Sequence, residues 1–226
     1  MLLTLPEVLP RPVADALCAR LAAGAWADGN ATSGAQAAMS KRNRQLPRDD
    51  ALAQQASHLV LEAVRASPLF LSAALPRVIL PPLFNRYDLG DGFGIHVDNA
   101  IRSLPDGTPL RTDLSFTLFL SDPDSYDGGE LVVETAFGAQ EVKLEAGAMV
   151  LYPSSSLHKV NPVTRGVRIC AFSWLQSLVR DADTRGLLFD LDQSVQVLAK
   201  ERGTADGEVV RLTAVYHNLM RRFAEA

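Results

Sequence analysis

A series of short β-type runs between Arg77 and Gln176, separated by turn residues, limits the fold of this chain more than any other feature. Glycine and proline interrupt the runs at regular spacing. The predicted strands cover residues 78–87, 94–98, 112–121, 130–134, 141–144, 148–152, 158–160 and 167–175. Many short strands at such spacing are typical of a β-sandwich or jelly roll. The strands do not alternate with helices, which disfavours a doubly wound parallel sheet.

Helical periodicity flanks this β region on both sides. Before it, residues 51–66 carry apolar side chains at helical spacing, and Asp49 or Asp50 offers an N-cap. After it, Gly203 and Gly207 separate two more apolar stripes, and we expect this helical pair to pack on the β core. The sequence thus predicts an α+β chain with a mainly β core. Its parts are an N-terminal helical support region (1–76), a jelly-roll core (77–178) and a C-terminal helical extension (179–226).

The composition is that of a globular protein, and it narrows the range of partners. Hydrophobic residues make up 47% of the 226 residues, charged residues make up 21%, and the formal net charge is −4. A mildly acidic chain lacks the basic surface that broad nucleic-acid binding needs. Cys18 and Cys170 lie far apart, and the sequence shows no signal peptide and no membrane-length apolar run. We therefore expect a cytoplasmic protein with reduced thiols and no nucleic-acid or membrane partner.

The segment Gly94-Ile95-His96-Val97-Asp98 carries the strongest chemical signal. Residues i and i+2 of a strand point to the same face, with Cα atoms roughly 6.6 Å apart, so His96 and Asp98 can converge on one cation. His158 lies on a different predicted strand and supplies a second imidazole. Two histidines and one carboxylate form a facial triad, which leaves open positions on the metal and suits non-haem Fe(II).

Arg168 stands among apolar residues of the last predicted strand. A charge in such surroundings is costly unless it has a partner. The guanidinium offers a bidentate fork for a carboxylate. A dicarboxylate co-substrate would supply that partner if one of its ends chelated the metal and the other met Arg168.

Five segments give these residues a wider context. They are Lys41-Arg42-Asn43-Arg44-Gln45-Leu46, Phe84-Asn85-Arg86-Tyr87, His96-Val97-Asp98-Asn99-Ala100, Tyr126-Asp127-Gly128-Gly129-Glu130-Leu131 and Tyr152-Pro153-Ser154-Ser155-Ser156-Leu157-His158. Their order, with Arg168 on the following strand, resembles the Fe(II)/2-oxoglutarate dioxygenases. The details resemble the prolyl-4-hydroxylase-like branch and, more narrowly, the bacterial PKHD-type hydroxylases of the PiuC-like group. The resemblance spans about residues 20 to 176, and the C-terminal helices match the family's appended region in position.

The resemblance implies a double-stranded β-helix and an oxygen-dependent reaction. It implies Fe(2+) bound by His96, Asp98 and His158, and 2-oxoglutarate anchored by Arg168. Tyr87 stands where related hydroxylases place a tyrosine near the co-substrate, although it also fits a core aromatic. The family is usually credited with L-ascorbate as an auxiliary reductant, and some members are linked with siderophore-iron uptake. O2 and a small-molecule or peptide substrate complete the implied reaction, which yields succinate and a hydroxylated product.

The residues leave several alternatives open. A non-catalytic cupin-like module that binds a metal or another ligand would use the same barrel, and a zinc isomerase or hydrolase would use the same triad. The basic segment 41–48 is either a solvated face or a border of the substrate entrance. The helical stripes near both termini are predicted to be core, with the interface of a homo-oligomer as the alternative for one of them. His58 and His217 have no ligand-spaced partner and are expected to be structural.

Overall fold

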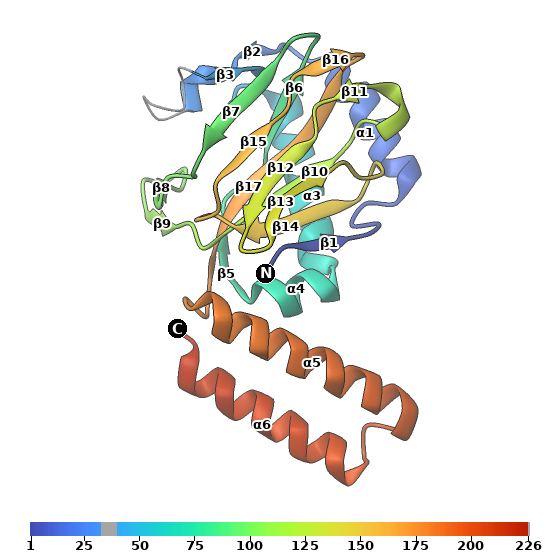
Figure 1. Cartoon of the computed structure of the whole chain (residues 1–226), viewed down its shortest axis with the longest axis vertical. Helices are drawn as coiled ribbons and strands as arrows, with labels where there is room; N and C mark the ends of the chain where they lie inside the picture. The colour runs from blue at the N-terminus through green and yellow to red at the C-terminus, as the bar shows by residue number, and fades with distance from the viewer. Residues whose placement is uncertain (33–39, 226) are drawn as a thin grey trace.

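The computed structural model describes residues 1–32 and 40–225, and in it two antiparallel sheets face each other (Figure 1). In this part of the chain the larger sheet has eight strands in the order β1-β14-β10-β17-β6-β4-β2, and β5 also pairs with β17. Its strands are β1 (Leu3–Leu5), β2 (Ala27–Asp28), β4 (Arg44–Gln45), β5 (Pro76–Ile79), β6 (Leu83–Tyr87), β10 (Leu114–Phe119), β14 (Met149–Pro153) and β17 (Arg168–Ser177).

The smaller sheet has five strands among the described residues, in the order β13-β12-β15-β7-β3. Its strands are β3 (Lys41–Arg42), β7 (Gly92–His96), β12 (Leu131–Thr135), β13 (Gly138–Val142) and β15 (His158–Val160). Two separate ribbons complete the β structure: β8 (Ile101–Ser103) pairs with β9 (Pro109–Arg111), and β11 (Asp127–Gly128) pairs with β16 (Val163–Arg165).

Apolar side chains from both sheets meet in the space between them. Phe119 and Tyr152 point inward from the larger sheet, and Leu131, Val133 and Val160 point inward from the smaller one. Every residue of β10 is buried, as expected of a strand covered on both faces. The mainly β core predicted from the sequence is therefore confirmed.

Helices cover the outer face of the larger sheet. These are α1 (Arg11–Ala22), α3 (Ala51–Ala66) and α4 (Pro68–Ala74), and their buried side chains join those of β10, β14 and β17 in the largest apolar cluster. Helix α3 has the bounds that the sequence predicts, and its N-cap is Asp50, which accepts a hydrogen bond from the Ala53 N–H at 2.9 Å. The helices thus hold the larger sheet rigid from behind and leave its inner face to the smaller sheet.

The C-terminal helices differ from the prediction in where they pack. Helices α5 (Ala182–Arg202) and α6 (Gly207–Phe223) form a hairpin that projects from the barrel (Figure 1). Helix α5 packs on α4 instead of on a sheet, and the Ser72 hydroxyl donates a hydrogen bond to Asp192 between them. Leu75, Val179 and Leu188 form the small core at this junction. No helix in the described residues is both long enough and apolar enough to cross a bilayer.

Some strand boundaries also differ from the prediction. The run predicted over 78–87 is two strands, β5 and β6, because Pro81 and Pro82 cannot continue the ladder. The ribbon formed by β8 and β9 was not predicted, because neither of its strands carries an apolar run. The turn before β12 needs its glycines: Gly128 has φ +69°, and a Cβ there would lie 2.1 Å from the Pro162 carbonyl oxygen.

The aromatic contact beneath the larger sheet yields a stability prediction. Phe70 of α4 is fully buried, and its ring meets that of Phe116 edge-on at a centroid distance of 6.1 Å. We expect Phe70→Ala to lower the free energy of unfolding by about 3–5 kcal/mol, because it leaves a cavity in the core. Phe137→Ala is the matched control, since that ring is 97% exposed and its loss should change little. Urea denaturation measures both, and equal effects would contradict this account of the core.

Candidate functional site

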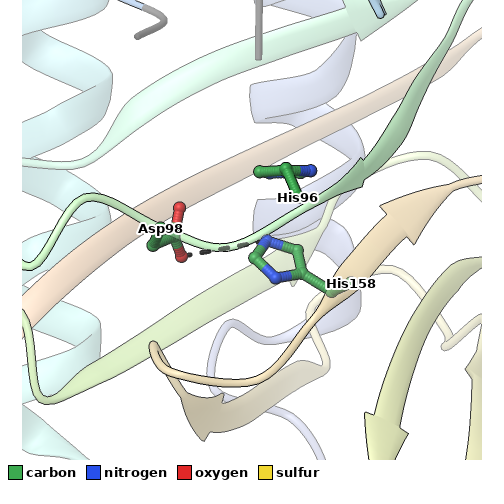
Figure 2. Close-up of side chains that lie close together, drawn as sticks. All are labelled: His96, Asp98 and His158. Atoms are coloured by element: carbon green, nitrogen blue, oxygen red, sulfur yellow. Dashed lines mark ion pairs between the residues drawn. The ribbon is translucent and has the colours of Figure 1, made fainter. Parts of the chain in front are cut away.

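Two imidazoles face each other between neighbouring strands of the smaller sheet. His96 ends β7, His158 begins β15, and the antiparallel register pairs them directly. Their ring centroids lie 4.2 Å apart. With Asp98 they form a group whose potential ligand atoms all lie within 4.8 Å of one another (Figure 2). The three residues predicted as metal ligands are thus brought together, although they come from two distant parts of the chain.

Asp98 reaches this group by a different route from the one the sequence predicted. Strand β7 ends at His96, so Asp98 lies beyond it and the i, i+2 rule of a regular strand does not position it. Hydrogen bonds hold it instead. The Ser115 hydroxyl on β10 donates to Asp98 Oδ2 at 2.6 Å, and the Ser115 and Ser154 hydroxyls lie 2.7 Å apart. The larger sheet therefore orients the carboxylate toward His158, whose Nε2 is 3.8 Å away.

The outer nitrogen of each histidine is occupied by the backbone. The Nδ1 of His96 lies 2.8 Å from the Gly94 carbonyl oxygen, and the Nδ1 of His158 lies 2.9 Å from that of Ser156. Donation at Nδ1 leaves Nε2 as the free lone pair, the arrangement usual for metal-binding histidines. Burial and the neighbouring imidazole of His158 lower the pKa of His96 to about 4. His96 is therefore neutral at pH 7, as metal binding requires.

This donor set fits a transition-metal ion. Two neutral imidazoles and one carboxylate are the 2-His-1-carboxylate set, and three protein ligands leave coordination positions for other molecules. The group has only these three members among the described residues, whereas a structural zinc site usually closes with four. The ring of Phe93 stacks on His96 at a centroid distance of 3.6 Å and limits rotation of that imidazole.

Arg168 lies in the same pocket and lacks a counter-ion. Its side chain is 1% exposed at the start of β17, and no carboxylate in the described part of the chain pairs with it. One guanidinium nitrogen donates to Cys170 Sγ at 3.1 Å, but the buried Nε has no hydrogen-bond partner. A buried cation left in this state is strongly unfavourable. The arrangement fits an anionic ligand in the pocket.

Tyr87 is both a core aromatic and a wall of the pocket. It is 2% exposed, stands directly opposite Arg168 in the pairing of β6 with β17, and its ring centroid lies 5.1 Å from Arg168 Cζ. Burial raises the pKa of Tyr87 well above that of free tyrosine, so the phenol keeps its proton. The Asn85 amide donates to the Tyr87 hydroxyl at 3.3 Å, which leaves the phenolic proton free for another acceptor.

The pocket contains every residue singled out for the site and several that were not. Beyond His96, Asp98, His158, Arg168 and Tyr87, its walls include Lys41, Asn85, Phe93, Arg102, Ser115, Tyr152, Phe172 and Trp174. Sequence reasoning missed Ser115 and Arg102, because their contacts are made across strands distant in the chain. His58 and His217, expected to be structural, are exposed on helices α3 and α6.

The basic segment 41–48 was expected to be either a solvated face or a border of the substrate entrance, and different parts of it fit each alternative. Lys41 lines the pocket, and burial lowers its pKa to about 8. Arg48 lines an adjacent groove that also reaches Arg102. Arg42 and Arg44 point to solvent. The two ends of the segment therefore border the site, and its middle is a solvated face.

Comparison with known proteins identifies the family of this chain. Residues 82–176 match the 2OG-Fe(II) oxygenase superfamily, and residues 182–225 match the PKHD-type hydroxylase C-terminal domain. A PKHD-type hydroxylase of Caulobacter sp. (strain K31) is 58% identical over 226 residues, covering 100% of both chains. Another, from Rhizorhabdus wittichii, is 55% identical over 228 residues with the same full coverage.

Solved structures share the fold at low identity. A Pseudomonas putida prolyl-4-hydroxylase superimposes with a TM-score of 0.54 and 21% identity, over 77% of this chain and 92% of its own. A Trichoplax adhaerens prolyl hydroxylase, in complex with a peptide fragment, superimposes with a TM-score of 0.52 and 13% identity, over 82% of this chain and 86% of its own. HygX from Streptomyces hygroscopicus, with nickel, 2-oxoglutarate and hygromycin B bound, superimposes with a TM-score of 0.51 and 14% identity, over 79% of this chain and 84% of its own. These likenesses confirm the predicted double-stranded β-helix.

The hydrogen bond from Ser115 to Asp98 yields a prediction about metal affinity. We expect Ser115→Ala to weaken Fe(II) binding by about 10- to 100-fold, because the carboxylate loses the group that orients it. Anaerobic competition with a chromophoric chelator measures this. Ser155→Ala removes an exposed hydroxyl from the loop before β15 and should leave the affinity unchanged. An unchanged affinity in Ser115→Ala would show that Asp98 does not depend on this contact.

Proposed function

This chain belongs to the PKHD-type hydroxylases and is a 2OG-Fe(II) oxygenase-type hydroxylase, and we propose that its active site is the pocket of His96, Asp98, His158 and Arg168. One observation carries the proposal. A set of three converging metal ligands and a buried arginine without a counter-ion line the same pocket. The first feature suits Fe(II), and the second suits the free carboxylate of 2-oxoglutarate.

Each side chain has a defined task in this proposal. His96, Asp98 and His158 would hold the iron, and a set of three protein ligands would leave coordination positions for 2-oxoglutarate and O2. Arg168 binds the carboxylate of 2-oxoglutarate that lies away from the metal. The protonated hydroxyl of Tyr87, beside Arg168, donates a second hydrogen bond to that carboxylate.

The bound iron supplies the oxygen chemistry: 2-oxoglutarate, O2 and a substrate C–H bond become succinate, CO2 and a C–OH group. The chain supplies orientation and a dry site. Phe93 and Tyr152 pack against the two imidazoles, with Tyr152 edge-on to His158 at a centroid distance of 5.2 Å. These rings keep bulk water from the ligands, and a low local dielectric strengthens the bond between Arg168 and an anion.

Further features of the proposal rest on the family resemblance. L-ascorbate would act as auxiliary reductant and keep the iron in its ferrous state. We also propose a division into a support region (1–76), a catalytic core (77–178) and a C-terminal extension (179–226), for which the family matches to residues 82–176 and 182–225 are the support. The relatives of similar fold hold a peptide fragment in one case and hygromycin B in another, so both substrate kinds are considered for this chain. A cytoplasmic location, a role in siderophore-iron uptake and a homo-oligomeric state complete the proposal.

The metal-binding role of the triad can be tested before any substrate is known. Anaerobic addition of Fe(II) and 2-oxoglutarate to metal-free protein should produce a weak visible charge-transfer band. His158→Ala should abolish it, because a ligand is lost. His58→Ala should retain it, since that exposed histidine pairs only with Glu62 on the surface of α3. A folded, metal-loaded protein without the band would instead favour a zinc enzyme or a non-catalytic binding module.

The role of Arg168 leads to a separate prediction about co-substrate affinity. We expect Arg168→Gln to raise the Kd of 2-oxoglutarate by about 30-fold or more, because losing one partner of a buried charge pair costs at least about 2 kcal/mol. Titration of the charge-transfer band measures this Kd. Arg165→Gln is the matched control: it lies three residues earlier, is exposed and pairs with Asp127. An unchanged Kd in Arg168→Gln would place the co-substrate elsewhere.

A further inference from the structure

Arg102 is a third cation in the pocket, besides Arg168 and Lys41, and it lies over an aromatic ring. It belongs to β8, and its Cζ lies 3.4 Å from the centroid of the Trp174 ring. This distance is that of van der Waals contact, as in a guanidinium stacked on an aromatic face. Stacking of this kind uses the faces of the guanidinium and leaves its N–H edge for an acceptor.

That N–H edge has no acceptor in the described part of the chain. Neither a hydrogen bond nor an ion pair from the Arg102 side chain is present there, and its buried Nε is without a partner. Arg111, its neighbour on β9, shows the usual arrangement, because it pairs with Asp113 and Glu225. Burial lowers the pKa of Arg102, which agrees with a cation held partly away from water. An arginine that is held by stacking, and whose N–H groups have no acceptor in the described residues, is positioned to bind an anion.

The position of Arg102 separates it from the proposed co-substrate site. Arg168, Cys170, Phe172 and Trp174 are alternate residues of β17, and all four line the pocket. Six residues of strand place Arg168 and Trp174 roughly 20 Å apart at their Cα atoms. Arg168 and the Trp174 platform of Arg102 therefore stand far apart along this strand.

Arg102 also lies near the carboxylate of the candidate metal site. Trp174 is the register partner of Ser115, which holds Asp98, so the stacked pair is next to the carboxylate ligand. Arg102 lines the adjacent groove as well, together with Arg48. The nearby carboxylate of Asp98 and the positive charge of Arg48 act on Arg102 in opposite directions. The pocket and the groove thus meet at Arg102, and the groove carries Arg48 and Asp28 among its lining residues.

We propose that Arg102, stacked on Trp174, binds a carboxylate of the molecule that is hydroxylated. This inference rests on the proposed function and specifies its substrate class: an organic acid, or a peptide that presents a carboxylate. The planar edge of the guanidinium forms a bidentate pair with that group. The carboxylate thereby fixes which C–H bond of the substrate faces the iron.

Trp174 itself can report on this binding. The chain has two tryptophans, so Trp26→Phe leaves Trp174 as the sole indole fluorophore. The protein is loaded with Fe(II) and saturating 2-oxoglutarate under anaerobic conditions, which occupies the Arg168 site and prevents turnover. Valerate and its neutral amide, valeramide, are then titrated as small probes. N-acetyl-trialanine with a free C-terminal carboxylate and the same peptide with a C-terminal amide are the peptide probes.

We expect at least one of the two acids to change the fluorescence of Trp174 with a Kd at least tenfold lower than that of its amide. The acid that does so distinguishes a small organic acid from a peptide carboxylate. Arg102→Gln should abolish the difference between acid and amide. Arg102→Lys keeps the charge without the planar fork and should give an intermediate difference. Arg77→Gln removes an exposed positive charge on β5 and should leave the difference unchanged.

Equal affinities for acid and amide in both probe pairs would overturn the inference. So would an acid preference that persists in Arg102→Gln. The charge-transfer band of the same samples separates the two proposals: if the band forms but no acid preference is seen, the proposed function stands and only the role of Arg102 fails. If Arg102→Gln raises the Kd of 2-oxoglutarate as strongly as Arg168→Gln does, Arg102 belongs to the co-substrate site, and the substrate role is wrong.

Discussion

The antiparallel pairing of β7 with β15 is the contact on which the site depends. It sets His96 directly opposite His158, so the backbone register alone brings the two imidazoles into contact. A slip of one residue in either strand would turn its histidine to the other face of the sheet. The regular ladder ends at this pair, because β7 stops at His96 and β15 starts at His158. Asp98 therefore lies outside the ladder and is held by Ser115 of the opposite sheet.

Strand β17 provides the other half of the site. Its alternation sends Arg168, Cys170, Phe172 and Trp174 into the pocket, and Ile169, Ala171 and Leu175 join the apolar cluster beneath the helices. A guanidinium buried among Tyr87, Phe119 and Cys170 lowers the stability of the empty protein, since no acid in the described residues neutralises it. An anionic ligand removes that cost on binding. The free protein is thus less stable than the protein with an anion bound at Arg168, where the co-substrate is proposed to bind.

The sequence predicted local features well and cross-strand ones poorly. The bounds of α3 follow from its apolar spacing and the Asp50 cap, and the barrel follows from the spacing of turns. The ligand set was predicted because a His-x-Asp segment, a distal histidine and a following buried-type arginine occur together in one order along the chain. The route by which Asp98 reaches the metal group was wrong, since β7 ends two residues earlier than the pattern indicates. Ser115 and Arg102 gave no signal, because the first meets Asp98 only where β10 packs near the end of β7, and the second meets Trp174 only where β8 packs on β17.

The fold assigns the two proposed anion contacts to elements of different stability. Arg168 belongs to a central strand with neighbours on both sides, so its position is bound to that of the whole barrel. Arg102 belongs to a two-stranded ribbon that pairs with neither large sheet and lies beside the end of β7 (Figure 1). If both proposals hold, changes in this ribbon would alter the substrate contact without disturbing His96, Asp98 and His158. An enzyme built this way would keep one oxygen chemistry while its substrate contact varies, because Arg102 is not needed to hold the core together.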